Sequence, residues 1–138
     1  MLLALLAWRT LDSWAAFPAG SQNAKFMLGA GNRPDGRMYL LLTRGADSGG
    51  GAWRQEVADL PEGRWVHLEA YYRKAADATG QVIVWQDGER LLDLAGVPTA
   101  NDDDLQWAVT NYGQDTAPAD VTVYVDDAAI GTSRLGPR

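Results

Sequence analysis

Residues 65–73 read Trp-Val-His-Leu-Glu-Ala-Tyr-Tyr-Arg, and they carry the strongest indication of fold class in the chain. Within it, apolar or small side chains alternate with polar or amphipathic ones. The first set is Val66, Leu68, Ala70 and Tyr72, and the second is His67, Glu69, Tyr71 and Arg73. Successive side chains of a β-strand point to opposite faces, so the pattern predicts a strand with one face in the core.

The segment that follows strengthens this prediction. Residues 81–86 read Gln-Val-Ile-Val-Trp-Gln, a composition rich in β-branched and aromatic residues that favours a second strand. Asp87-Gly88 then predicts a two-residue hairpin turn, and residues 90–94 are the expected returning strand. If Val82 and Val84 face the core, Trp85 faces away from it.

Elsewhere in the chain, short apolar runs separated by Gly and Pro predict further strands. These runs cover residues 2–8, 24–28, 37–43, 53–57, 105–112 and 121–130. Residues 12–23 contain Pro18 and Gly20 and are expected to be rich in turns, while residues 75–79 are a short candidate for a helix. About ten short strands predict an all-β, two-sheet antiparallel sandwich or a barrel, formed by one domain over residues 1–138.

Composition and charge exclude several classes of function. With 12 basic and 18 acidic residues the net charge is −6, which disfavours binding to nucleic acid. The chain has no cysteine, so disulfides and thiol catalysis are excluded. The apolar residues 2–8 lack a preceding basic residue and are too few for a membrane span. We interpret them as a buried strand.

Four short motifs occur in a recognisable order. They are Gly-Arg-Trp-Val-His-Leu-Glu at residues 63–69, Val-Ile-Val-Trp-Gln-Asp-Gly at 82–88, Asn-Tyr-Gly at 111–113 and Val-Tyr-Val-Asp-Asp at 123–127. Together they resemble motifs of the concanavalin A-like lectin/glucanase superfamily, in particular its laminin-G-like and polysaccharide-lyase-like jelly rolls. The resemblance implies two antiparallel sheets, one of them concave, with carbohydrate as the usual ligand and an extracellular location.

The resemblance also bears on how the chain assembles. The chain is shorter than most members of that superfamily, and the difference would lie in missing N-terminal strands. A sheet that lacks strands exposes an open edge, at which a second copy of the chain could pair to form a homo-oligomer.

The superfamily includes glucanases and polysaccharide lyases, and each activity requires particular residues. Its glucanases carry carboxylates at alternate positions of one strand. Residues 37–43 resemble that strand, but they include no carboxylate. A lyase requires a base and a group that neutralises a uronate, and His67, Tyr71 and Arg73 are of suitable types. The fuller lyase motifs, Arg-x-Glu-Leu-Arg and Gln-Ile-His, are missing. The chain is therefore expected to lack catalytic activity, with a lyase acting on a uronate polymer kept as an alternative.

Carbohydrate binding is the leading interpretation. The chain holds six Trp and five Tyr, and flat aromatic rings stack on the C–H faces of sugars. Binding is expected on the concave sheet, and the predicted carbohydrate-binding residues are Tyr39, His67, Glu69, Tyr71, Arg73, Trp85 and Tyr112. For each of them, packing or a hydrogen bond within the fold is the competing explanation. A structural or protein-binding module of the laminin-G-like kind is the other alternative.

No cofactor is predicted, although a structural Ca²⁺ ion fits the resemblance. Related jelly rolls hold this ion with a carboxylate of the final strand, and oxygen ligands are what Ca²⁺ requires. If Val121, Val123 and Val125 point inward, Asp126 points outward and is the candidate ligand. Asp127 shares the inward face unless a bulge intervenes. A hydrogen-bonded Asp at the end of a strand is the alternative.

Overall fold

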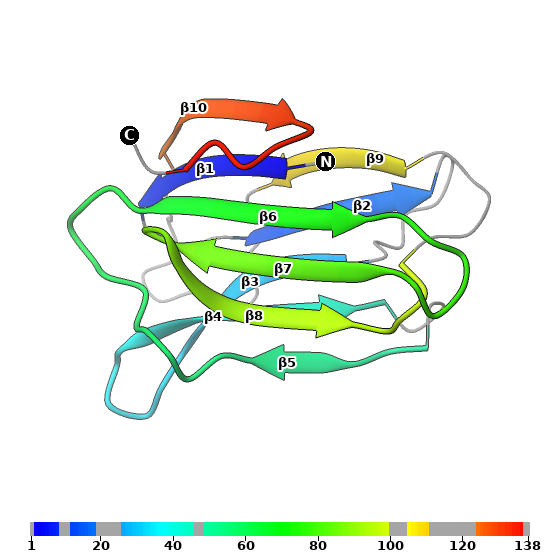
Figure 1. The fold of residues 1–138 in the computed structure, drawn as a ribbon. Helices are drawn as coiled ribbons and strands as arrows, with labels where there is room; N and C mark the ends of the chain where they lie inside the picture. The colour runs from blue at the N-terminus through cyan, green and yellow to red at the C-terminus, as the bar shows by residue number, and fades with distance from the viewer. Residues whose placement is uncertain are drawn as a thin grey trace.

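The computed structural model consists of β-strands and turns (Figure 1). It describes residues 2–8, 12–18, 26–45, 49–99, 105–110 and 124–136, and it describes side chains in residues 26–45, 49–99 and 124–136. The strands are β1 (Leu2–Trp8), β2 (Asp12–Pro18), β3 (Phe26–Asn32), β4 (Met38–Arg44), β5 (Ala52–Arg54), β6 (His67–Arg73), β7 (Gln81–Gln86), β8 (Glu89–Ala95), β9 (Leu105–Thr110) and β10 (Tyr124–Gly131). In the described ranges, no helix is long and apolar enough to cross a membrane.

The strands form two five-stranded antiparallel sheets. Sheet A has the order β10-β1-β6-β7-β8, and sheet B has the order β5-β4-β3-β2-β9. In Figure 1, β6, β7 and β8 of sheet A lie in front of the strands of sheet B. The predicted all-β, two-sheet antiparallel sandwich is therefore confirmed.

The core lies between the two sheets. Phe26, Leu28, Leu40 and Leu42 of sheet B belong to one buried cluster with side chains of β6 and β7. The latter side chains are Leu68, Ala70, Tyr72, Val82 and Val84. Burial of such apolar surface is the main driving force for folding, and it is what fixes which face of each strand points inward.

The predicted faces of β6 and β7 are confirmed. Leu68, Ala70 and Tyr72 are buried in the core, and Val82 and Val84 are fully buried beside them. Trp85 consequently lies on the outer face of sheet A. Burial of Glu69 departs from the simple pattern, because this outward-facing carboxylate is as buried as a core residue.

The Asp87-Gly88 hairpin is also confirmed, and it explains why two of the motifs occur together. Asp87 has φ of 50° and Gly88 has φ of 87°, as a two-residue turn between twisted strands requires. The Asp87 carboxylate accepts a hydrogen bond from the His67 backbone N–H at 2.9 Å and from Arg64 at 2.7 Å. The turn thus holds the loop that precedes β6.

Several predicted elements differ from the structure, among them the strand expected at residues 53–57, which ends at Arg54. Residues 12–18 form β2 instead of turns, since the pairing of β2 with β3 and β9 outweighs the turn-forming residues around it. Strand β3 continues past Gly29 to Asn32. Residues 75–79 are not helical. Glycine is required at residue 31 of β3 because the Tyr39 ring packs over it. A Cβ at this position would lie 2.7 Å from the ring.

Strand β10 contains an irregularity at its two aspartates. Its register against β1 shifts between the pairs that involve Asp126 and Ala129, and Asp127 has φ of 51°. The bulge removes strict alternation at this point, so the face of Asp127 does not follow from that of Val125, which is exposed. Residues 121 and 123 lie outside the described residues.

Burial of the Tyr72 hydroxyl makes the stability of the fold depend on pH in the alkaline range. Its hydroxyl donates a hydrogen bond to the backbone oxygen of Thr99, and burial raises the pKa of Tyr72 above its ordinary value. Above about pH 10 the unfolded chain therefore loses this proton while the folded chain keeps it, and stability falls by up to about 1.4 kcal/mol per pH unit.

We expect Tyr72→Phe to be less stable at neutral pH by about 1 kcal/mol, because it leaves a buried carbonyl without its partner. Between pH 10 and 12, however, its stability should decline less steeply than that of the wild type. Urea denaturation across this range measures both effects. Parallel slopes for the two proteins would contradict the assignment of this titration to Tyr72.

Candidate functional site

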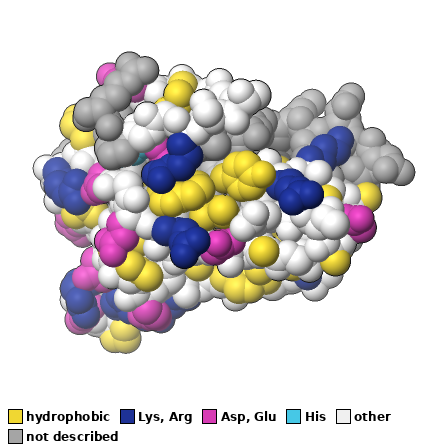
Figure 2. All heavy atoms as spheres, viewed as in Figure 1, with side chains coloured by type: hydrophobic (Ala, Val, Ile, Leu, Met, Phe, Trp, Pro, Cys, Tyr) yellow, Lys and Arg dark blue, Asp and Glu magenta, His cyan; other side chains and the backbone are white. Residues whose placement is uncertain are grey.

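The outer face of sheet A carries an apolar patch. Tyr71 on β6 and Ile83 and Trp85 on β7 are half-buried, and they point away from the core residues that alternate with them. We term these three residues the aromatic face. Figure 2 shows apolar side chains grouped over this part of the molecule, with basic and acidic side chains around them.

Strand register places the members of the aromatic face together. Tyr71 lies opposite Ile83, and Trp85 lies opposite Glu69 on one side and Arg90 on the other. Directly opposed side chains of antiparallel strands are about 5 Å apart, and diagonal neighbours are within reach of aromatic rings. Tyr71 and Trp85 therefore form one continuous surface.

Polar groups form a rim along β8 and at the ends of β6 and β7. Asp93 accepts hydrogen bonds from Gln81 at 2.6 Å and from Arg90 at 3.1 Å. Arg73 is exposed at the end of β6. The rim thus supplies hydrogen-bond donors and acceptors beside the apolar patch.

Arg134 reaches the aromatic face from the far end of the chain. The segment that follows β10 turns back along β1 (Figure 1). From it, the Arg134 guanidinium lies 4.4 Å from the centroid of the Trp85 ring, and its Nε donates a 2.7 Å hydrogen bond to Glu69 Oε2. The Glu69 side chain is 1% exposed and that of Arg134 is 43% exposed. Arg134 therefore covers Glu69 and presents its other side to solvent.

His67 belongs to the same cluster but lies deeper. Its side chain is 11% exposed, and its Nε2 lies 3.8 Å from Glu69 Oε1. Neither His67 Nδ1 nor Glu69 Oε1 has a hydrogen-bond partner among the residues that the structure describes. His67 and Glu69 were expected to contact a ligand directly. Glu69 lies behind Arg134 and holds it by a hydrogen bond, and His67 is largely buried beside Glu69.

Tyr39 does not join this surface, contrary to expectation. It lies on β4, which belongs to sheet B, and its neighbours Leu40 and Leu42 fill the core. On the outer face of sheet B, the Arg54 guanidinium lies 4.3 Å and that of Arg33 5.4 Å from the centroid of the Tyr39 ring. A strand of sheet B cannot place a side chain beside Trp85, so Tyr39 is removed from the proposed site.

The remaining candidates are Tyr112 and Asp126. Tyr112 lies outside the described residues. The Asp126 carboxylate accepts a 2.8 Å hydrogen bond from the backbone N–H of Asp127. Within the described part of the chain, no group of three or more His, Asp or Glu side chains is placed to hold a metal ion.

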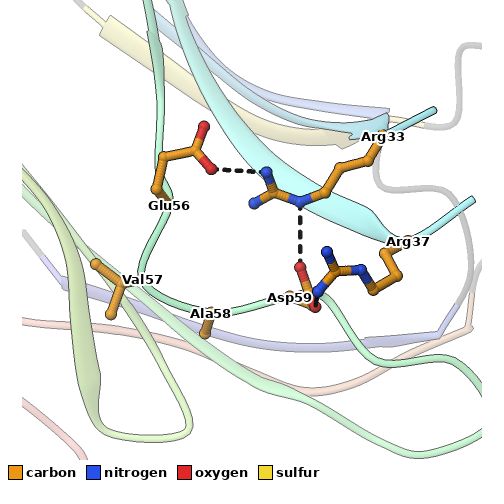
Figure 3. Close-up of a pocket in the computed structure, with 6 residues that line it drawn as sticks. All are labelled: Arg33, Arg37, Glu56, Val57, Ala58 and Asp59. Atoms are coloured by element: carbon orange, nitrogen blue, oxygen red, sulfur yellow. Dashed lines mark hydrogen bonds and ion pairs between the residues drawn. The ribbon is translucent and has the colours of Figure 1, made fainter. Parts of the chain in front are cut away.

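A polar hollow lies at one end of the sandwich, between the loop that precedes β4 and the segment that follows β5. Its volume is about 240 Å³, and it is lined by Arg33, Arg37, Glu56, Val57, Ala58 and Asp59 (Figure 3). Arg33 pairs with Glu56 at 2.6 Å and with Asp59 at 3.2 Å, and Arg37 pairs with Asp59 at 2.8 Å. The two cations of the hollow are thus already neutralised.

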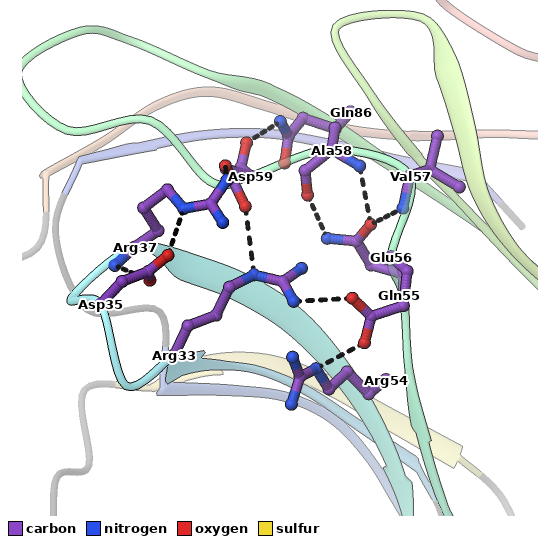
Figure 4. A network of polar contacts seen from close by, with 10 residues as sticks. All are labelled: Arg33, Asp35, Arg37, Arg54, Gln55, Glu56, Val57, Ala58, Asp59 and Gln86. Atoms are coloured by element: carbon purple, nitrogen blue, oxygen red, sulfur yellow. Dashed lines mark hydrogen bonds and ion pairs between the residues drawn. The ribbon is translucent and has the colours of Figure 1, made fainter.

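The wider polar network around this hollow has a structural role. Figure 4 shows it continuing to Asp35, Arg54 and Gln55, and Gln86 of sheet A donates a 2.8 Å hydrogen bond to the Asp59 backbone oxygen. The hydrogen bond with Arg33 holds the pKa of Glu56 below its usual value, so this carboxylate stays ionised and paired. The network ties the two sheets together, and a ligand entering the hollow would have to break its ion pairs.

No family model, no curated protein and no solved structure matches this chain. The side chains of the aromatic face and their surroundings are therefore the features that bear on function.

Proposed function

We propose that the chain is a non-catalytic carbohydrate-binding module whose sandwich is a jelly roll of the concanavalin A-like kind. The observation that carries the proposal is the pairing of Tyr71 and Trp85 on the outer face of sheet A with a polar rim beside them. A sugar ring has an apolar C–H face and a polar edge of hydroxyl groups, and a surface of this composition complements both.

Chain connectivity supports the jelly-roll part of the proposal. The chain passes from sheet A to sheet B after β1, returns after β5, and crosses twice more around β9. As a result, β10 pairs with β1 and β9 pairs with β2, so strands from the two ends of the chain are neighbours in both sheets. Non-sequential pairing of this kind is typical of Greek-key and jelly-roll sandwiches.

A polysaccharide lyase is less well supported. His67 is the sole histidine and the natural base, but its side chain is 11% exposed and lies against Glu69. A general base must come within hydrogen-bond distance of the proton that it removes from the substrate. A side chain buried to this degree against Glu69 is poorly placed to approach a polymer on the aromatic face.

The first test is binding of the whole chain to an array of neutral and uronate glycans. We expect Trp85→Ala to reduce affinity about fivefold or more, since stacking of one flat ring on an aromatic side chain contributes about 1–3 kcal/mol. Tyr39→Ala is the matched control, because it removes an aromatic ring flanked by arginines on the opposite sheet. A silent array, or equal losses for the two variants, would argue against binding at the aromatic face.

A protein-binding role is the second candidate, favoured by strand β10. This strand lies at the edge of sheet A, and Tyr124, Val125 and Ile130 on it are exposed. Unpaired edges with apolar side chains favour pairing with another chain, including a second copy.

Light scattering at micromolar concentration tests self-association through β10. A dimer that Ile130→Lys and Val125→Lys convert to monomers is the expected result, because edge lysines oppose strand pairing. A monomer at every concentration would exclude self-association of this protein through the edge.

A further inference from the structure

Building on the proposed carbohydrate-binding function, we infer that Arg134 makes the aromatic face selective for acidic glycans by pairing with the carboxylate of a uronate residue. Three features of Arg134 support this selectivity: the contacts that hold it, the atoms that it exposes, and the charge around it.

Arg134 is held in place by a buried carboxylate. Glu69 is almost fully buried, so movement of Arg134 away from it would leave an unpaired charge inside the protein. Stacking on the Trp85 ring, 4.4 Å away, adds a second restraint on the plane of the guanidinium. A ligand is therefore more easily bound on top of Arg134 than in its place, and Arg134 acts as part of the surface instead of as a removable cover.

The outer side of the guanidinium offers hydrogen-bond donors. Its Nε is directed at Glu69 Oε2. Its two terminal nitrogens, Nη1 and Nη2, form no hydrogen bond with any residue that the structure describes. A guanidinium presents its N–H groups in a planar fork that matches a carboxylate in bidentate geometry, whereas a neutral hydroxymethyl group at the same sugar carbon fits it less well. Glu69 neutralises Arg134 in the resting protein but lies behind it.

Charge on this face favours an anion although the whole chain is acidic. Arg73, Arg90 and Arg134 lie around the aromatic face, and the acidic side chains among them are Glu69, which is buried, and Asp93, which pairs with Arg90. Asp77 follows Arg73 in the next loop, and its pKa is lowered chiefly by hydrogen bonds with Thr79. An anionic sugar placed over Tyr71 and Trp85 would therefore lie beside three guanidiniums, and their charge is offset in part by Asp77 and Asp93.

The test compares oligomers that differ at one functional group. Tetramers of galacturonate, glucuronate and mannuronate are titrated into the whole chain beside their methyl esters, which keep the ring and lose the charge. At low ionic strength we expect the matching acid to bind about tenfold more tightly than its ester, as one charge-assisted pair provides. In 1 M NaCl, where the Debye length is about 3 Å, this preference should shrink.

Two variants assign the preference to Arg134. In Arg134→Gln, the ratio of acid affinity to ester affinity should fall from about ten to about one, whatever the affinity of this variant for the ester. Arg134→Lys should recover part of that preference, because it restores the charge without the planar fork. Arg54→Gln, on the outer face of sheet B, is the control and should retain the full preference.

The outcomes separate the inference from the proposed function. Equal affinity for acid and ester, with both bound, would overturn the selectivity while leaving carbohydrate binding in place. A preference that survives in Arg134→Gln would overturn the role of Arg134. Binding of neither oligomer class would overturn the selectivity for acidic glycans, and a silent array of neutral and uronate glycans would overturn the proposed function as well. If Arg134→Gln does not fold, the comparison of acid and ester on the wild type still decides whether the face is selective.

Discussion

Replacing Arg134 with Ala should lower the free energy of unfolding by about 2–3 kcal/mol. The loss comes from Glu69, which is 1% exposed and would retain a buried charge without its 2.7 Å partner. Truncation of one member of a buried ion pair is usually costlier still, but the Arg134 side chain is partly exposed and the expected value is reduced accordingly.

Chemical denaturation of two further variants would isolate this effect. Arg90→Ala removes an exposed arginine whose partner, Asp93, is three residues away on the same strand, and it should cost less than about 0.5 kcal/mol. In the Arg134→Ala background, Glu69→Gln should recover part of the lost stability by removing the buried charge. An Arg134→Ala protein as stable as Arg90→Ala would show that Glu69 does not depend on Arg134.

Phe26→Ala should have the largest effect on stability, about 3–5 kcal/mol. Phe26 is fully buried, and its ring meets Tyr72 edge-on with the centroids 5.9 Å apart and lies 6.4 Å from that of Trp53. Truncation would remove contacts that join sheet B to sheet A and leave a cavity between the two layers.

Urea denaturation checks this prediction, with an unchanged m-value as evidence that the unfolded reference state is the same. Phe26→Leu retains most of the apolar volume and should cost less than half as much. Val57→Ala, at an exposed position, should change the free energy of unfolding by less than about 0.5 kcal/mol. Similar losses in Phe26→Ala and Val57→Ala would contradict the placement of Phe26 in the core.

The parts of the fold that the sequence predicted are those with local signals. Alternation in β6 and β7 identified their inner faces, because an error of one residue would move every apolar side chain to the outside. Asp87-Gly88 marked its hairpin because both residues accept positive φ. These signals require no knowledge of the rest of the chain.

The errors have the opposite origin. Strand β2 escaped notice because its pairing partners, β3 and β9, are set by the tertiary fold and not by its own residues. Tyr39 was grouped with the wrong residues because alternation indicates the face of a strand but not the sheet that the strand joins.

Arg134 gave no signal at all. It meets Glu69 across 65 positions of the chain, and nothing in its neighbouring residues indicates that contact. A buried Glu on the outer face of a strand would have been the clue, since a buried carboxylate needs a basic partner. The sequence pattern alone, however, places Glu69 among exposed residues.

Glycan binding at the aromatic face can be tested by a two-dimensional NMR titration of the ¹⁵N-labelled chain with the best-binding oligosaccharide from the array. Binding at the aromatic face predicts the largest shifts at the Trp85 indole N–H and at the backbone amides of Tyr71, Ile83 and Arg134. Largest shifts around Tyr39 and Arg54 on sheet B, or no shifts with any glycan, would contradict it.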